Sequence, residues 1–186
     1  MARPKSDDKR NSILAACQAV IVRDGLSATT ADIAKEAGIA TGSLFTYFPT
    51  KADLLNELYV VLKSEMTAEL AGALTGGDDK EKLRRAWNAW TGWAAANAGK
   101  HQALELLRTS DQLTDRSREF GEAAVRPVFD LISLNAAGKA TGITPGFLFE
   151  LINVVSIATM DNMASYPDRA VEYRDAGFEA MWRIIQ

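Results

Sequence analysis

The chain has 186 residues, of which 47% are hydrophobic and 24% are charged, so it can bury a core and is unlike a disordered chain. The formal net charge is only −3, so the protein as a whole is not a polycation. Residues 1–51, however, carry seven basic and five acidic side chains and are slightly positive. A polyanion would therefore prefer the N-terminal part. One cysteine, Cys17, excludes an internal disulfide, and residues 1–17 hold no apolar run long enough for a signal peptide. We expect a cytoplasmic protein.

Helical spacing begins near the N-terminus and is interrupted by glycines. Apolar residues from Ile13 to Ile21 predict a first helix that ends at Gly25. The sequence TTAD, residues 29–32, predicts the start of a second helix, with either threonine as its N-cap. Gly38 tolerates a left-handed turn, and a short third helix is expected over 41–47, before Pro49.

The remaining chain is also helical in pattern, and no strand alternation stands out. A long fourth helix starts near residue 50 with the same capping style and ends near the glycines at 76–77. Further helices are expected over 78–97, 100–109, 114–135, 145–165 and 167–185. The fold class is therefore all-α with about nine helices: a three-helix domain over 1–50 and a larger helical bundle over 51–186.

Two short helices joined by a glycine turn, with a third behind them, describe a helix-turn-helix, whose second helix enters the DNA major groove. Leu44 and Phe48 are four residues apart and are expected to anchor that helix to the core. The outward positions can then meet bases through hydrogen bonds or apolar contacts: Thr41, Gly42, Phe45 and Thr46. Phosphate contacts are expected from Ser43, Tyr47, Lys51 and the helix start at Thr29 and Thr30.

The same stretch resembles the DNA-binding domain of the TetR family of transcriptional repressors. The features that carry the resemblance are the apolar first helix, Gly25, TTADIAKEAG, GSLFTYF, and Lys51 followed by two leucines. The resemblance implies an all-helical homodimer that binds a palindromic operator and is released by a small molecule bound in the C-terminal domain. By position it places Thr41, Thr46 and Ala31 at bases and Thr30, Ser43, Tyr47 and Lys51 at phosphates. Ala31 and Phe45 depart from the family pattern, because neither side chain can hydrogen-bond to a base.

Three tryptophans within seven residues form a large apolar surface on the fifth helix. Core packing is the ordinary interpretation of such a row of side chains, but the resemblance implies a ligand cavity in this region. The abundant aromatic residues favour an apolar or flat effector. The candidate lining residues are Leu62, Met66, Trp87, Trp90, Trp93, Leu106, Phe129, Asn153 and Ser156.

The last two helices are apolar almost all round, so each must be covered on more than one side. Either they pack entirely within one subunit or they also form a dimer interface. The candidate interface residues are Phe149, Ile152, Tyr173, Gly177, Phe178, Met181 and Trp182.

Other functions have weaker support in the sequence. His101 and Cys17 are the only residues of their types, no zinc-ligand spacing exists, and no glycine-rich phosphate loop follows a strand. We therefore expect no catalysis, no metal and no cofactor, and the apolar run at 143–160 is too short and polar for a membrane span. Lys5, Lys9 and Arg10 form either a solvated tail or an arm that touches DNA. The alternative function is an all-helical adaptor that binds proteins without DNA or ligand.

Overall fold

The structure is a computed structural model that describes residues 5–137 and 144–186. These residues form nine α-helices, one short 3-10 helix and no strand, which confirms the predicted all-α fold. The helices are α1 (Lys5–Asp24), α2 (Thr30–Glu36), α3 (Thr41–Tyr47), α4 (Lys51–Ala68), α5 (Asp79–Ala96), α6 (Ala98–Arg108), α7 (Asp115–Ala136), α8 (Pro145–Ser165) and α9 (Ala170–Ile184), with the 3-10 turn η1 at Pro167–Arg169.

The chain divides into two compact units. The first unit combines Met1–Ser64 with Ala98–Gly121, and the second combines Glu65–Asn97 with Glu122–Gln186. The division follows packing, whereas the predicted domains, 1–50 and 51–186, are a division by function. The functional boundary therefore stays a prediction.

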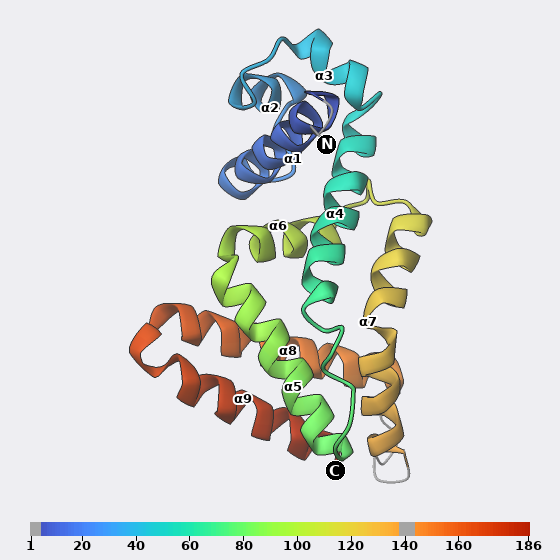
Figure 1. Cartoon of the computed structure of the whole chain (residues 1–186), viewed down its shortest axis with the longest axis vertical. Helices are drawn as coiled ribbons and strands as arrows, with labels where there is room; N and C mark the ends of the chain where they lie inside the picture. Colours follow the sequence, from blue (N-terminus) through green and yellow to red (C-terminus); the bar gives the residue numbers. More distant parts are fainter. Residues whose placement is uncertain (1–4, 138–143) are drawn as a thin grey trace. The chain divides into compact units, whose positions relative to one another are not determined.

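Local hydrogen bonds fix the helix ends in the first unit, where α1, α2 and α3 gather at the N-terminal end (Figure 1). The Thr29 hydroxyl accepts from the backbone N–H of Asp32, and the Asp32 carboxylate accepts from the Thr29 backbone, so the predicted cap of α2 is a complete capping box. Thr50 and Asp53 repeat this arrangement at the start of α4.

The core of the first unit is built from one or two side chains of each short helix. Ile13 of α1, Ile33 of α2, Leu44 of α3 and Leu54 of α4 are completely buried, and Phe48 is 1% exposed. Packing among these side chains holds the short helices in place, because helices of seven residues are marginal by themselves.

A side-chain amide in α4 joins this helix to the α6–α7 loop. The Asn56 Nδ2 donates to the carbonyl of Gln112 at 2.8 Å, and its Oδ1 accepts from the backbone N–H of Thr114 at 2.9 Å and the Thr114 hydroxyl at 3.0 Å. All three bonds lie within the first unit. Asn56 therefore satisfies polar backbone groups at the start of α7 that would otherwise need water.

The second unit has its own apolar core, in which α8 and α9 run side by side (Figure 1). Its buried members come from α5, α7, α8 and α9: Leu83, Trp87, Ile132, Ala136, Leu148, Ile152, Phe178, Met181 and Ile185. The Trp87 indole N–H donates to the carbonyl of Arg174 at 2.9 Å, so this ring is held to α9 by a hydrogen bond as well as by packing.

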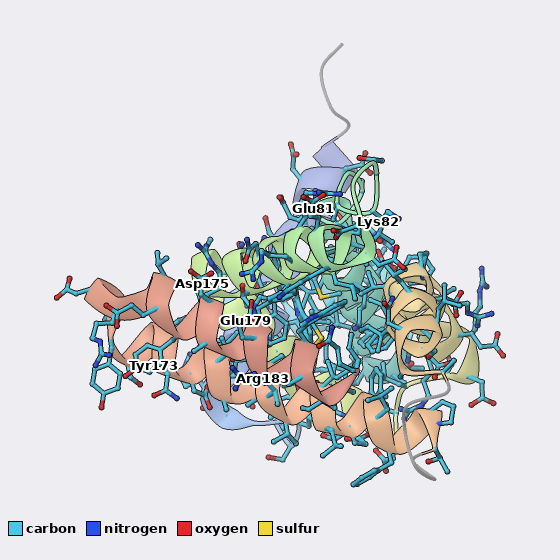
Figure 2. All side chains as sticks on the ribbon, turned by 90° about the horizontal axis from the view of Figure 1, so that it is seen from below. Glu81, Lys82, Tyr173, Asp175, Glu179 and Arg183 are labelled. Carbon is cyan, nitrogen blue, oxygen red and sulfur yellow. The ribbon has the colours of Figure 1, made fainter. Side chains whose placement is uncertain are left out.

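Charged side chains line the edge of the α5–α9 contact, where Asp175 and Glu179 lie on the side of α9 next to α5 (Figure 2). Arg84 pairs with Glu179 and lies 4.1 Å from the centre of the Phe178 ring. Lys80 lies 3.3 Å from Glu179. Burial opposes the ionisation of Glu179, but hydrogen bonds from Lys80 and Arg84 outweigh it and hold the pKa of this carboxyl below its usual value.

Helix α8 is the one helix of the described residues that is long and apolar enough to cross a membrane, with a mean hydropathy of 1.2. Only its length and composition suggest a membrane segment, and 39% of its apolar 18-residue stretch is buried inside the protein. Core helices of soluble proteins have the same character, so α8 is weak evidence for a membrane segment.

Candidate nucleic-acid interface

The α2–α3 turn is short and closed by backbone hydrogen bonds. Gly38 has a φ of +67°, which an L side chain adopts only with strain, and the N–H of Ile39 donates to the carbonyl of Ala34 at 3.0 Å. The glycine therefore ends α2 and sets the direction in which α3 leaves it. This is the tight turn that the sequence predicts for a helix-turn-helix.

Helix α3 presents two different faces. Leu44 is completely buried, and the neighbouring Phe45 is 44% exposed. The other predicted base-contact residues lie near Phe45 in the sequence: Gly42 and Thr46 are exposed and Thr41 is partly exposed. Four of the five predicted base contacts thus belong to one exposed face of a helix that the core holds from behind.

The predicted phosphate-contact residues differ in their exposure and in whether their side chains already have a hydrogen-bond partner. Ser43 is exposed, and Tyr47 and Thr30 are partly exposed. The Thr29 hydroxyl is already used, since it donates to the Asp32 carboxylate at 2.6 Å. That hydrogen bond holds the pKa of Asp32 below its usual value, so the cap stays ionised to a lower pH than an ordinary aspartate would. Ala31, the fifth predicted base contact, is exposed on α2.

Two basic side chains near the interface have partners within the protein. The Lys51 ammonium donates to the carbonyl of Leu26 at 2.6 Å, which ties the start of α4 to the turn after α1. Arg10 pairs with Glu57 and lies 5.0 Å from the centre of the Phe48 ring. Arg10 therefore supports the fold in this structure, Lys9 is exposed, and the side chain of Lys5 lies outside the described residues.

Cys17 is completely buried in α1, as its position on the core face predicts. Burial raises the pKa of its thiol to about 12, and the nearby Lys51 charge only partly opposes the effect. A neutral buried thiol is a poor nucleophile, so Cys17 contributes apolar packing. Among the described residues, no group of three or more histidine, cysteine and acidic side chains could hold a metal ion.

The predicted ligand-lining residues fall into both compact units. Leu62 and Leu106 belong to the first unit, and the others, from Met66 to Ser156, belong to the second. Trp87 is part of the core, Trp93 is 7% exposed, and Trp90 is partly exposed and meets Trp87 edge to face. Trp90 is thus the tryptophan of the three with the most surface left for a ligand, while Phe129 and Asn153 are also partly exposed.

Among the described residues of the second unit, two buried side-chain polar atoms have no hydrogen-bond partner, Asn88 Oδ1 and Arg174 Nε. Asn88 lies on α5, and Arg174 lies on α9, where its backbone carbonyl accepts from the Trp87 indole. A buried polar atom without a partner is costly. Sequence reasoning missed both residues, although Asn88 interrupts an apolar stripe just as Asn153 does.

The predicted dimer residues are mostly packed within the subunit. Ile152, Gly177, Phe178 and Met181 are buried within the subunit, so these four side chains pack in its own core. The other three predicted dimer residues, Phe149, Tyr173 and Trp182, are partly exposed. Their rings contact those of Phe129, Tyr166 and Phe178, respectively.

The exposed apolar side chains of α8 and α9 are different residues. Phe147 and Val154 of α8 are 55% and 62% exposed, Tyr166 follows with 53%, and Val171 of α9 is 59% exposed. The sequence could not single them out, because a helix that is apolar all round has no periodicity to mark its outer face.

The fold and the α2–α3 geometry define an all-helical protein with an N-terminal helix-turn-helix. Residues 13–58 match the family model of bacterial regulatory proteins of the tetR family. A crystal structure assigned to the TetR-family transcription regulators from Shewanella sp. PV-4 is 27% identical, with a TM-score of 0.80 over 94% of this chain and 96% of the other.

Two further crystal structures share the fold at lower identity. A TetR-family transcription regulator from Marinobacter aquaeolei VT8 is 19% identical, with a TM-score of 0.78 over 98% of both chains. The TetR-like regulator LfrR from Mycobacterium smegmatis, in complex with proflavine, is 20% identical, with a TM-score of 0.63 over 93% and 94% of the two chains. Residues 13–58 therefore match the DNA-binding helix-turn-helix domain of the tetR family, as the sequence predicts, and the chain shares the fold of TetR-family transcription regulators.

Proposed function

We propose that this protein is a cytoplasmic, ligand-responsive transcriptional repressor that binds a palindromic operator as a homodimer. The observation that carries the proposal is the division of α3, where Leu44 and Phe48 are buried and Gly42, Phe45 and Thr46 face outward. A helix that a core holds from one side and that presents small, hydroxyl and aromatic groups on the other suits the major groove. Tyr47 and Ser43 at its edge suit the phosphates.

Selection of DNA from a random pool at near-physiological salt tests the proposal. We expect the purified protein to enrich a palindrome, because two subunits related by a two-fold axis present two copies of α3. The Thr46→Ala, Tyr47→Ala double variant loses one base contact and one phosphate contact, and should bind the enriched sequence about 100-fold more weakly.

The matched control is a Thr109→Ala, Phe120→Ala double variant, which removes a threonine and an aromatic ring from exposed positions outside the helix-turn-helix and the proposed dimer interface. This control should select the same palindrome with unchanged affinity. A folded wild-type protein that enriches no sequence at any salt concentration would contradict DNA recognition and favour the adaptor function instead.

The homodimer is proposed from the exposed apolar side chains of α8 and α9. Phe147, Val154, Tyr166 and Val171 are each more than half exposed, and large exposed apolar side chains on or next to two packed helices favour a protein interface. The partly exposed Phe149, Tyr173 and Trp182 stay candidates at its edge.

A charge in the middle of the proposed interface should break the dimer. We expect Val154→Glu to weaken self-association about 100-fold, because the carboxylate would be buried without a partner. Sedimentation equilibrium measures the change, and Ala19→Glu, on an exposed position of α1, is the control that should stay dimeric. A Val154→Glu protein that keeps the wild-type association constant would remove α8 from the interface.

The effector is proposed to bind in the second unit, where Trp90 is partly exposed and where Asn88 and Arg174 have buried polar atoms without a hydrogen-bond partner. Such a ligand would be flat and apolar, with one donor for the Asn88 oxygen and one acceptor for the Arg174 nitrogen. A related regulator binds proflavine, so this compound is the first to add while tryptophan fluorescence is followed. Release from DNA requires the ligand to bind the DNA-free state more tightly than the DNA-bound state.

A further inference from the structure

The recognition helix of this protein lacks the side chains that usually identify bases. Residues 38–50, GIATGSLFTYFPT, include no charged residue and no side-chain amide. Two-bond contacts to a base edge come from arginine or lysine at guanine and from asparagine or glutamine at adenine. Helix α3 can make none of them, so its selectivity must come from other groups.

The polar groups that α3 does offer discriminate weakly. The exposed or partly exposed hydroxyls are those of Thr41, Ser43, Thr46 and Tyr47. A hydroxyl can donate or accept, and it can therefore satisfy acceptors on guanine or thymine as well as donors on adenine or cytosine.

The apolar groups of the same face are more distinctive. The Phe45 ring is 44% exposed, whereas Phe48, the residue that caps the C-terminal end of α3, is 1% exposed, so the phenylalanine inside α3 lies on the surface. Ala31 adds an exposed methyl group from α2, and Thr46 adds another from α3. In the major groove of unmodified DNA, the apolar group that a base presents is the C5-methyl of thymine.

We infer that this protein reads its operator chiefly through thymine methyl groups, with the Phe45 ring as the principal contact and the Thr46 and Ala31 methyls as further contacts. The inference rests on the proposed function and adds to it the chemical feature that defines the operator. A phenyl ring has no hydrogen-bonding group, so the contact at Phe45 depends on apolar burial alone.

Uracil in place of thymine tests this directly, because it pairs identically and lacks only the methyl group. Each thymine of the selected operator is replaced singly by uracil in synthetic duplexes, and the dissociation constant is measured by fluorescence anisotropy at fixed salt. We expect a loss of about three- to fivefold at each contacted thymine, the size expected for one buried methyl group. The loss should occur at a few positions in each half-site and be absent elsewhere.

Variants connect the effect to Phe45. For each position we take the ratio of the affinity for the thymine duplex to the affinity for the uracil duplex. With Phe45→Ala, this affinity ratio should fall to about one at one position in each half-site. Phe45→Tyr keeps the ring and should keep the ratio. Phe120→Ala is the matched control, since Phe120 is similarly exposed, at 41%, on α7 outside the helix-turn-helix. It should leave every ratio unchanged.

The outcomes separate the inference from the proposed function. If the protein selects an operator that binds equally well with uracil at every position, the methyl readout is overturned and DNA recognition stands. A uracil-sensitive operator whose sensitivity survives Phe45→Ala overturns the role of this ring. If no sequence is enriched from the random pool of ordinary, thymine-containing DNA, the proposed function fails, and the inference fails with it.

Discussion

Replacing Leu44 with alanine is expected to lower the free energy of unfolding by about 2 to 5 kcal/mol, the usual range for a leucine removed from a core. Leu44 is completely buried, so its loss leaves a cavity behind α3. The neighbouring Phe45→Ala should change stability by about 0.5 kcal/mol or less, because its ring is 44% exposed. Urea denaturation followed by far-ultraviolet circular dichroism measures both changes.

DNA binding should respond to these two variants for different reasons. The Leu44 variant loses operator binding only as far as α3 is no longer held in place, so a stabilising osmolyte should restore part of it. The Phe45 variant should lose selectivity while staying fully folded. Equal destabilisation by the two substitutions would contradict the two-faced α3 on which the proposed function depends.

The second large effect is expected at Gly177 of α9, where alanine should lower the free energy of unfolding by about 2 to 3 kcal/mol. A methyl group there would overlap the Thr159 hydroxyl and lie 2.9 Å from Cζ2 of Trp87. Neither neighbour can move freely, because the Thr159 hydroxyl donates to the carbonyl of Val155 and the Trp87 indole donates to that of Arg174.

Gly92 provides the matched control for this substitution. It lies inside α5, and a methyl group added to it would meet nothing within 4 Å. Gly92→Ala should therefore raise stability by about 0.5 to 1 kcal/mol, the ordinary gain of alanine over glycine in a helix. Thermal denaturation should show opposite shifts for the two alanine variants. Adding Thr159→Ala to Gly177→Ala should recover part of the loss, and no recovery would contradict the overlap with Thr159.

The helix ends were predictable because they depend on neighbouring residues. Thr29 with Asp32 and the pair Thr144–Pro145 each mark a helix start that the structure has at that position. The outward position of Phe45 was predictable in the same way, since Leu44 and Phe48 are four residues apart and share one side of a helical turn.

The contact partners of Lys51 and Gly177 were not predictable from the sequence. The sequence places Lys51 at a phosphate, and the structure shows its ammonium at the carbonyl of Leu26, a residue 25 positions away. Gly177 suits a close helix contact in any setting, and the structure places Thr159 and Trp87 of the same chain against it.

The sequence by itself thus determined an all-helical chain, the capped ends of α2, α4 and α8, and the two faces of α3. Tertiary structure decided that α6 belongs with α1 in the first unit, and that Ile152 and Phe178 are buried in their own subunit while Val154 is exposed. The physical reason is the range of the interactions. Caps and turns involve residues within one helical turn, whereas the face that a uniformly apolar helix buries depends on distant helices that pack against it.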